Sequence, residues 1–152
     1  GENIDVDGFR LNGNYSFQYC RNVVIRNAEI HSKDAFWNTE DVTVYDSVVD
    51  GEYLGWHSRN LRLVNCRISG TQALCYAENL VLENCTLGED ADLCFEYSSV
   101  HAEIKGRVHS VKNPRSGRIV AEEYGDIILD EHCKAPANCS IETEKKQSGE
   151  AA

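Results

Sequence analysis

The chain repeats itself every 19 residues, and this repeat constrains the fold more than any other feature of the sequence. The segment Asn60–Ile68 is followed at that spacing by the similar Asn79–Leu87 and preceded by Asp41–Val49 and Asn22–Ile30. A period of about 20 residues is typical of solenoids, in which each coil packs mainly on its neighbours. The repeat defines the coils 3–21, 22–40, 41–59, 60–78 and 79–98, of which the last is one residue longer.

Apolar residues alternate with polar ones inside each coil. One apolar column contains Ile4, Val23, Val42, Leu61 and Leu80, and the next contains Val6, Ile25, Val44, Leu63 and Leu82. This alternation predicts a strand with one face inward, and a similar strand follows a short corner. A third apolar segment centres on Phe17, Phe36, Gly55, Leu74 and Leu93. Because helical periodicity is absent, we predict an all-β, single-stranded parallel β-helix, a solenoid with three short strands per coil.

The regular repeat ends near residue 98. Residues 99–130 keep short apolar runs around a turn at Lys112–Gly117, and we interpret them as an irregular last coil or cap. On this interpretation residues 1–130 form one β-helix domain. Residues 131–152 are polar and contain Pro136, which indicates a loosely held tail.

The first coil begins at Asn3 with no capping sequence before it. An uncovered coil would expose Ile4, Val6, Phe9 and Leu11 together with a row of unpaired strand groups. We expect either further upstream coils or another copy of the chain to cover this end.

The corners of the coils carry asparagine, aspartate or glycine. One corner column is Asn3, Asn22, Asp41, Asn60 and Asn79, and another is Gly8, Asn27, Asp46, Asn65 and Asn84. These residue types tolerate left-handed backbone angles, and stacked amides can bond along the axis. The alternative, a row of metal ligands, lacks the glycine-rich nonapeptide of calcium-loading β-helices. We therefore expect a structural amide ladder, with neither metal nor cofactor.

The charge and the cysteines limit the partners and the compartment. A formal net charge of -10 argues against nucleic acid and anionic membranes, no apolar run reaches membrane-spanning length, and Gly1–Asp7 does not resemble a signal peptide.

The seven cysteines contain no C-x-x-C, and Cys66 and Cys85, like Cys75 and Cys94, fall one period apart. Columns of reduced core thiols and a cytoplasmic location are the preferred interpretation. A Cys66–Cys85 disulfide stays open, because adjacent strands lie about 4.8 Å apart.

Only the third segment departs from a purely structural pattern. If the Phe36 column faces inward, Trp37 and Trp56 stack outside beside polar and aromatic side chains, a combination that suits a sugar ring. The alternative is that both tryptophans pack against the C-terminal segment. The candidate ligand-binding residues are Asp34, Trp37, Glu52, Tyr53, Trp56, His57, Gln72, Tyr76 and Asp92.

Acid–base chemistry has weaker support. Asp34, Glu52, Asp92 and His57 are the candidates, and the carboxyl groups of Asp34 and Glu52 on adjacent coils resemble the spacing of a glycosidase pair. Spacing alone does not shift a pKa, and no H-E-x-x-H, G-x-S-x-G, Walker or Rossmann motif is present. Whether the chain is an enzyme stays open at this point, and no catalytic residue is assigned.

Several segments resemble the closing repeats of an uncharacterised bacterial family of right-handed, pectate-lyase-like β-helices. The resemblance is carried by Tyr15–Tyr19, Lys33–Trp37, Gly51–Trp56, Gly70–Tyr76, Asp92–Glu96 and Ile104–Asp130. It implies a right-handed coil and the C-terminal part of a longer protein, and it brings no known catalytic residues. The link to pectate lyases is an analogy of fold alone.

These observations favour a β-helix module that binds a ligand, with carbohydrate as the expected partner, over the third segments. The alternatives are a structural module that stacks with other chains and, third, a polysaccharide hydrolase or lyase.

Overall fold

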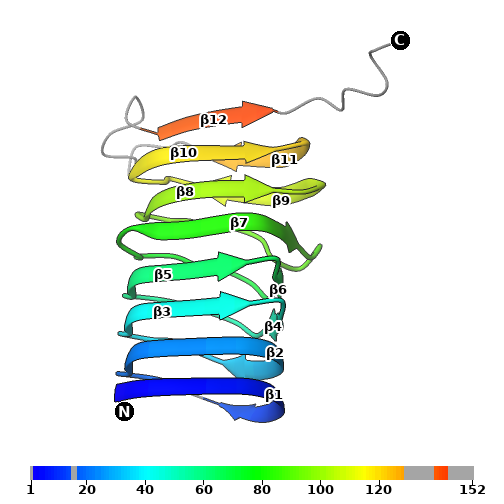
Figure 1. The fold of residues 1–152 in the computed structure, drawn as a ribbon. Helices are drawn as coiled ribbons and strands as arrows, with labels where there is room; N and C mark the ends of the chain where they lie inside the picture. Colours follow the sequence, from blue (N-terminus) through cyan, green and yellow to red (C-terminus); the bar gives the residue numbers. More distant parts are fainter. Residues whose placement is uncertain (1, 15–16, 129–138, 144–152) are drawn as a thin grey trace.

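The computed structural model describes residues 2–14, 17–128 and 139–143. In these ranges every regular element is a strand, and parallel pairing builds a β-solenoid of about seven turns that winds in a right-handed sense (Figure 1). The strands are β1 (Glu2–Asn14), β2 (Arg21–Lys33), β3 (Glu40–Tyr45), β4 (Val48–Asp50), β5 (Arg59–Val64), β6 (Arg67–Ser69), β7 (Leu80–Leu87), β8 (Ser99–Ile104), β9 (Arg107–Lys112), β10 (Ser116–Ala121), β11 (Glu123–Ile128) and β12 (Cys139–Thr143). The predicted fold class is confirmed.

One inward column runs the full height of the solenoid. It consists of Val6, Ile25, Val44, Leu63, Leu82, Ala102, Ile119 and Ile141. The step between its members is 19 residues as far as Leu82, then 20 to Ala102, 17 to Ile119 and 22 to Ile141. The same face of the sheet therefore stays inward although the coil length changes, because register is set by which face is buried.

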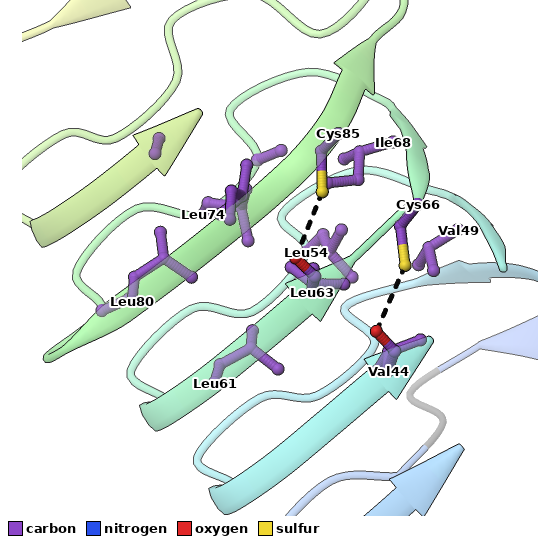
Figure 2. Close-up of a cluster of buried hydrophobic side chains, with 14 of the residues drawn as sticks. Val44, Val49, Leu54, Leu61, Leu63, Cys66, Ile68, Leu74, Leu80 and Cys85 are labelled. Atoms are coloured by element: carbon purple, nitrogen blue, oxygen red, sulfur yellow. Dashed lines mark hydrogen bonds between the residues drawn. The ribbon is translucent and has the colours of Figure 1, made fainter. Parts of the chain in front are cut away.

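The interior is filled by aliphatic side chains and free thiols. Figure 2 shows Leu61, Leu63 and their neighbours stacked coil on coil, with the Cys66 thiol donating to the Val44 carbonyl at 3.4 Å and the Cys85 thiol to the Leu63 carbonyl at 3.2 Å. Cys66 and Cys85 are both free thiols, so no Cys66–Cys85 bond is formed. Burial raises the pKa of Cys75 to about 12, which keeps that thiol protonated.

The corner columns form the predicted amide ladder. Asn22, Asn60 and Asn79 all have φ between 54° and 58°. Each donates its side-chain Nδ2 to the residue one coil earlier, at 3.1 Å to Asn3, 2.9 Å to Asp41 and 3.2 Å to Asn60. The second corner has matching bonds from Asn27 to Asp7 at 3.0 Å and from Asn84 to Asn65 at 2.6 Å. Left-handed corners and axial amide bonds thus reinforce the same coil spacing.

The third segment of each coil forms turns rather than the expected regular strand. Positive φ alternates along it, at Asp34, Phe36 and Asn38 in the second coil and at Gln72, Leu74 and Tyr76 in the fourth. The backbone still bonds from coil to coil: Asp34 N–H donates to the Glu52 carbonyl at 2.9 Å, and Leu74 N–H donates to the Leu54 carbonyl at 2.7 Å. The coil-to-coil bonds offset the strain of left-handed angles at non-glycine residues.

The fifth coil is out of step in its third segment. Phe95 N–H donates to the Ala73 carbonyl at 3.3 Å and Tyr76 N–H donates to the Glu96 carbonyl at 2.7 Å, so Glu96 follows Cys75 in its column. The predicted Cys75–Cys94 column is therefore wrong, although both thiols are buried. Phe95, which is fully buried, takes the inward place expected for Leu93.

The C-terminal part continues the solenoid beyond the expected cap. Strands β8 and β10 extend the main sheet, while β9 and β11 pair in a second sheet, so residues 99–128 contain two further coils. The expected polar tail contains β12, which pairs with β10. Ile141 of β12 lies opposite Ile119 of β10, and Ile141 is an apolar residue in an otherwise polar stretch. The rest of the predicted tail, 131–138 and 144–152, lies outside the described residues.

The ladder predicts a stabilising substitution. The Asp41 carboxylate accepts a bond from the Asn60 side chain, but it has no N–H to donate to the Asn22 side chain one coil earlier. No bond between Asn22 and Asp41 exists in the described structure. Asp41→Asn adds that missing donor, and we expect the free energy of unfolding to rise by about 0.5–1 kcal/mol in urea denaturation. Asp126→Asn, at an exposed position outside the ladder, is the control for charge removal. An unchanged or lower midpoint for Asp41→Asn would contradict the ladder account.

Candidate functional site

The third segments of the second to fifth coils carry a group of aromatic side chains that we call the aromatic face. Its members are Trp37, Tyr53, Trp56, His57, Tyr76 and Tyr97. His57 is exposed and the other five are half-buried. The inward places of these segments are taken by Phe36, Leu74 and Phe95, all with no exposed area. The aromatic face is therefore a second layer outside a complete core.

The rings contact one another along the helix axis. Trp37 lies 6.0 Å from Trp56, centroid to centroid, and Trp56 lies 4.9 Å from Tyr76 in an edge-to-face arrangement. His57 stacks on Tyr76 at 5.3 Å with an angle of 17° between the rings. Such pairs stabilise by about 0.5–1.5 kcal/mol beyond the area they bury, so the surface is preorganised. Every ring–ring contact of the two tryptophans within the described residues is with a ring of the second to fourth coils.

Polar contacts hold individual rings in place. Trp56 Nε1 donates to the Gln72 carbonyl at 2.7 Å, so Gln72 contributes its backbone to the site. Tyr53 packs edge-on against Trp56 at 5.2 Å, with the Lys33 ammonium 5.8 Å from the Tyr53 ring centre. Burial, with a smaller contribution from Glu96, raises the pKa of Tyr76, which keeps its hydroxyl protonated and able to donate.

Tyr97 belongs to this surface although the sequence pattern did not identify it. Its ring lies 5.6 Å from that of Tyr76, where simple 19-residue spacing pointed to Phe95. The signal available in the sequence was the extra length of the fifth coil. Beside Tyr97, Glu96 forms an ion pair with Lys112 at 3.5 Å, which links the site to β9.

A second, polar part of the site lies at the corner before the third segment. A pocket of about 550 Å³ is lined by Lys33, Asp50, Gly51, Glu52, Gly70, Thr71 and Asp90. Gly70 has φ +115°, and a Cβ there would stand 2.1 Å from the Gly51 carbonyl oxygen, so only glycine allows the coils to approach this closely. The Thr71 hydroxyl donates to Asp92, which places Asp92 above Thr71 rather than above Ala73 as simple 19-residue spacing suggested.

Asp34 differs from the other predicted site residues because it is buried, with 5% of its surface exposed. Among the residues that the structure describes, its Oδ1 has no hydrogen-bond partner. Burial raises the pKa of Asp34, the Lys33 charge opposes this, and the Glu52 charge adds to it. The predicted pairing with Glu52 therefore joins one exposed and one enclosed carboxyl group. The expectation that Asp34 faces a ligand at the surface is corrected.

His31 bridges two carboxylates next to this pocket. Its Nε2 lies 2.8 Å from Glu29 and its Nδ1 lies 3.2 Å from Asp50, which also accepts a bond from the Ser69 hydroxyl at 2.8 Å. Because both partners accept hydrogen bonds, only the doubly protonated imidazolium satisfies both. These bonds raise the pKa of His31, and the bond to His31 lowers the pKa of Glu29.

Within the part of the chain that the structure describes, no group of three or more His, Cys, Asp or Glu side chains is arranged to hold a metal ion. The same residues include no helix that is long and apolar enough to cross a membrane.

The fold and surface define a parallel β-helix protein with an aromatic face and an adjoining polar pocket. A family described as "Protein of unknown function (DUF3737)" matches residues 1–142, and the chain belongs to this family. No curated protein and no solved structure matches the chain.

The His31 bridge predicts a pH dependence. A raised folded-state pKa means that His31 contributes stability below its ordinary value of 6.5, and this contribution is lost as the pH rises through the folded-state pKa. Urea midpoints of the native protein and His31→Gln should therefore differ more at about pH 6 than at about pH 8.5. Both values lie above the range where Glu29 titrates, so that carboxylate stays charged throughout. A gap that is equal at both pH values would contradict the bridge.

Proposed function

We propose that this protein is a saccharide-binding β-helix module whose ligand lies on the aromatic face. The observation that carries the proposal is the contiguous set of five aromatic rings and one imidazole, partly exposed, outside a core that is already filled. An aromatic layer that the interior does not need is costly to maintain on a surface unless it contacts something.

The chemistry of the neighbourhood favours a sugar over other ligands. Aromatic rings offer apolar contact to the C–H faces of a pyranose, while His57, Glu52 and the Tyr76 hydroxyl offer hydrogen bonds to its hydroxyl groups. The net charge of -10 disfavours nucleic acid and other polyanions. Successive coils lie about 4.8 Å apart, and each of the second to fifth coils contributes at least one aromatic ring, so an extended oligosaccharide parallel to the axis can contact a ring on each of these coils.

The free thiols support a cytoplasmic place of action within this proposal. We also propose that the family is a distant member of the pectate-lyase-like β-helices and is bacterial, supported by the segments that carry the resemblance. A hydrolase or lyase activity ranks below binding, because the buried Asp34 is poorly placed to reach a substrate.

Assembly with other coils or chains is the second candidate. Ile4, Val6, Phe9 and Leu11 in β1 are partly exposed, whereas Val23 and Ile25, their counterparts one coil above, have no exposed area. A β1 edge of this kind suits stacking with another coil. Sedimentation that depends on protein concentration would favour this candidate, and a monomer at all concentrations would remove it.

Binding to the aromatic face is testable by substitution. On an array of neutral oligosaccharides, we expect hits that weaken by at least about tenfold in Trp56→Ala, because the central ring of the face is lost. His57→Ala, at an exposed position, should weaken binding with less effect on the fold.

The matched control is Tyr45→Ala, which removes an aromatic ring from β3, where Tyr45 contacts Arg26 instead of the aromatic face. Its affinity should equal that of the native protein. An empty array, or equal affinity for Trp56→Ala and Tyr45→Ala in calorimetry, would refute the proposal.

A further inference from the structure

We propose a second saccharide-binding site on the outer face of the main sheet, around His101, that takes a neutral sugar. It is separate from the aromatic face and is argued from different residues. Two adjoining hollows, of about 540 Å³ and 170 Å³, lie over strands β3, β5, β7, β8 and β10. They share Val81 and His101, so together they form one depression across neighbouring coils.

The hollow arises where the amide ladder stops. Below it, the corner column holds Asp41, Asn60 and Asn79; above it, the same column holds Ser99 and Ser116. Ser99 accepts a bond from the Asn79 backbone N–H at 2.8 Å, but its short side chain carries no amide to continue the ladder. Within the described residues, no side chain of the coil above donates to the Asn79 side-chain oxygen. The short serine side chains leave the hollow at this level.

Neutral groups around the hollow are available to a ligand, whereas its two arginines are already paired. Arg62 binds Glu83, and Arg118 binds Glu142 through two bonds of 2.8 and 2.9 Å. Thr43, Ser116 and the exposed His101 make no side-chain hydrogen bond within the described residues.

The floor of the hollow adds apolar contact. Val81 and Val120 lie there half-buried, between the polar groups of the rim. Hydroxyl, amide and imidazole groups around an apolar floor match the mixed C–H and O–H surface of a neutral saccharide. An anionic ligand is disfavoured, since both arginines are engaged by carboxylates and the protein carries a net charge of -10.

The ladder itself supplies a variant that fills the site and keeps the fold. In Ser99→Asn the new Nδ2 can donate to the Asn79 side chain, as Asn79 does to Asn60 at 3.2 Å, while the amide occupies the hollow. We expect unchanged or higher thermal stability together with at least about tenfold weaker binding. His101→Ala removes the central polar group at an exposed position and is the second variant should Ser99→Asn fail to fold.

The experiment is a titration of the ¹⁵N-labelled protein with neutral hexasaccharides, maltohexaose and cellohexaose among them. In the native protein the amide signals of Val81 and His101 should shift, and they should shift equally in Trp56→Ala, which removes only the central ring of the aromatic face. Shifts confined to the third segments would overturn this second site and leave the proposed function standing. If Trp56→Ala loses the shifts in the third segments but keeps those at His101, the second site is supported. No shift at Val81 or His101 with any sugar, or native affinity in Ser99→Asn and His101→Ala, would overturn it.

Discussion

Hydrogen bonding between equivalent positions of successive coils is the interaction on which the rest of this structure depends. Such bonding requires each coil to follow the same path around the axis. The corners of that path require left-handed backbone angles. Asn22, Asn60 and Asn79 supply those angles and bond along the axis through their side chains. Once the coils are in register, each side chain stands above the equivalent position of the previous coil, and the protein becomes a set of parallel columns whose members are about 4.8 Å apart.

This arrangement explains where function is to be sought. Inward columns must stay apolar along the whole solenoid, as the series from Val6 to Ile141 does through changes in coil length. Outer columns are free to change, and two changes create surfaces with chemical character. The third segments acquire aromatic side chains outside a filled core, and the corner column exchanges asparagine for Ser99 and Ser116. Both proposals follow from departures from the repeat and not from the repeat itself.

The sequence predicted the strand columns, the amide ladder and the free core thiols because each depends on residue type at a fixed spacing. Other features carry no such signal. Alternating positive φ at Phe36 and Leu74 is imposed by bonds to the coils on either side, and these residue types do not favour it. Steps of 20, 17 and 22 residues remove the self-similarity that would have revealed the register of β8 and β10 and the existence of β12. The burial of Asp34 was not predicted either, because its carboxyl group, in a column with Tyr53 and Gln72, was interpreted as a ligand-binding group.

The central claim is that a saccharide covers the aromatic face, and the protein contains its own reporter for it. Its two tryptophans, Trp37 and Trp56, both lie in that face. The most direct measurement is acrylamide quenching of tryptophan fluorescence with and without a neutral oligosaccharide identified as a ligand. The account predicts a saturable fall in quenching, with a midpoint equal to the binding constant. Quenching that stays the same at saturating ligand would contradict it.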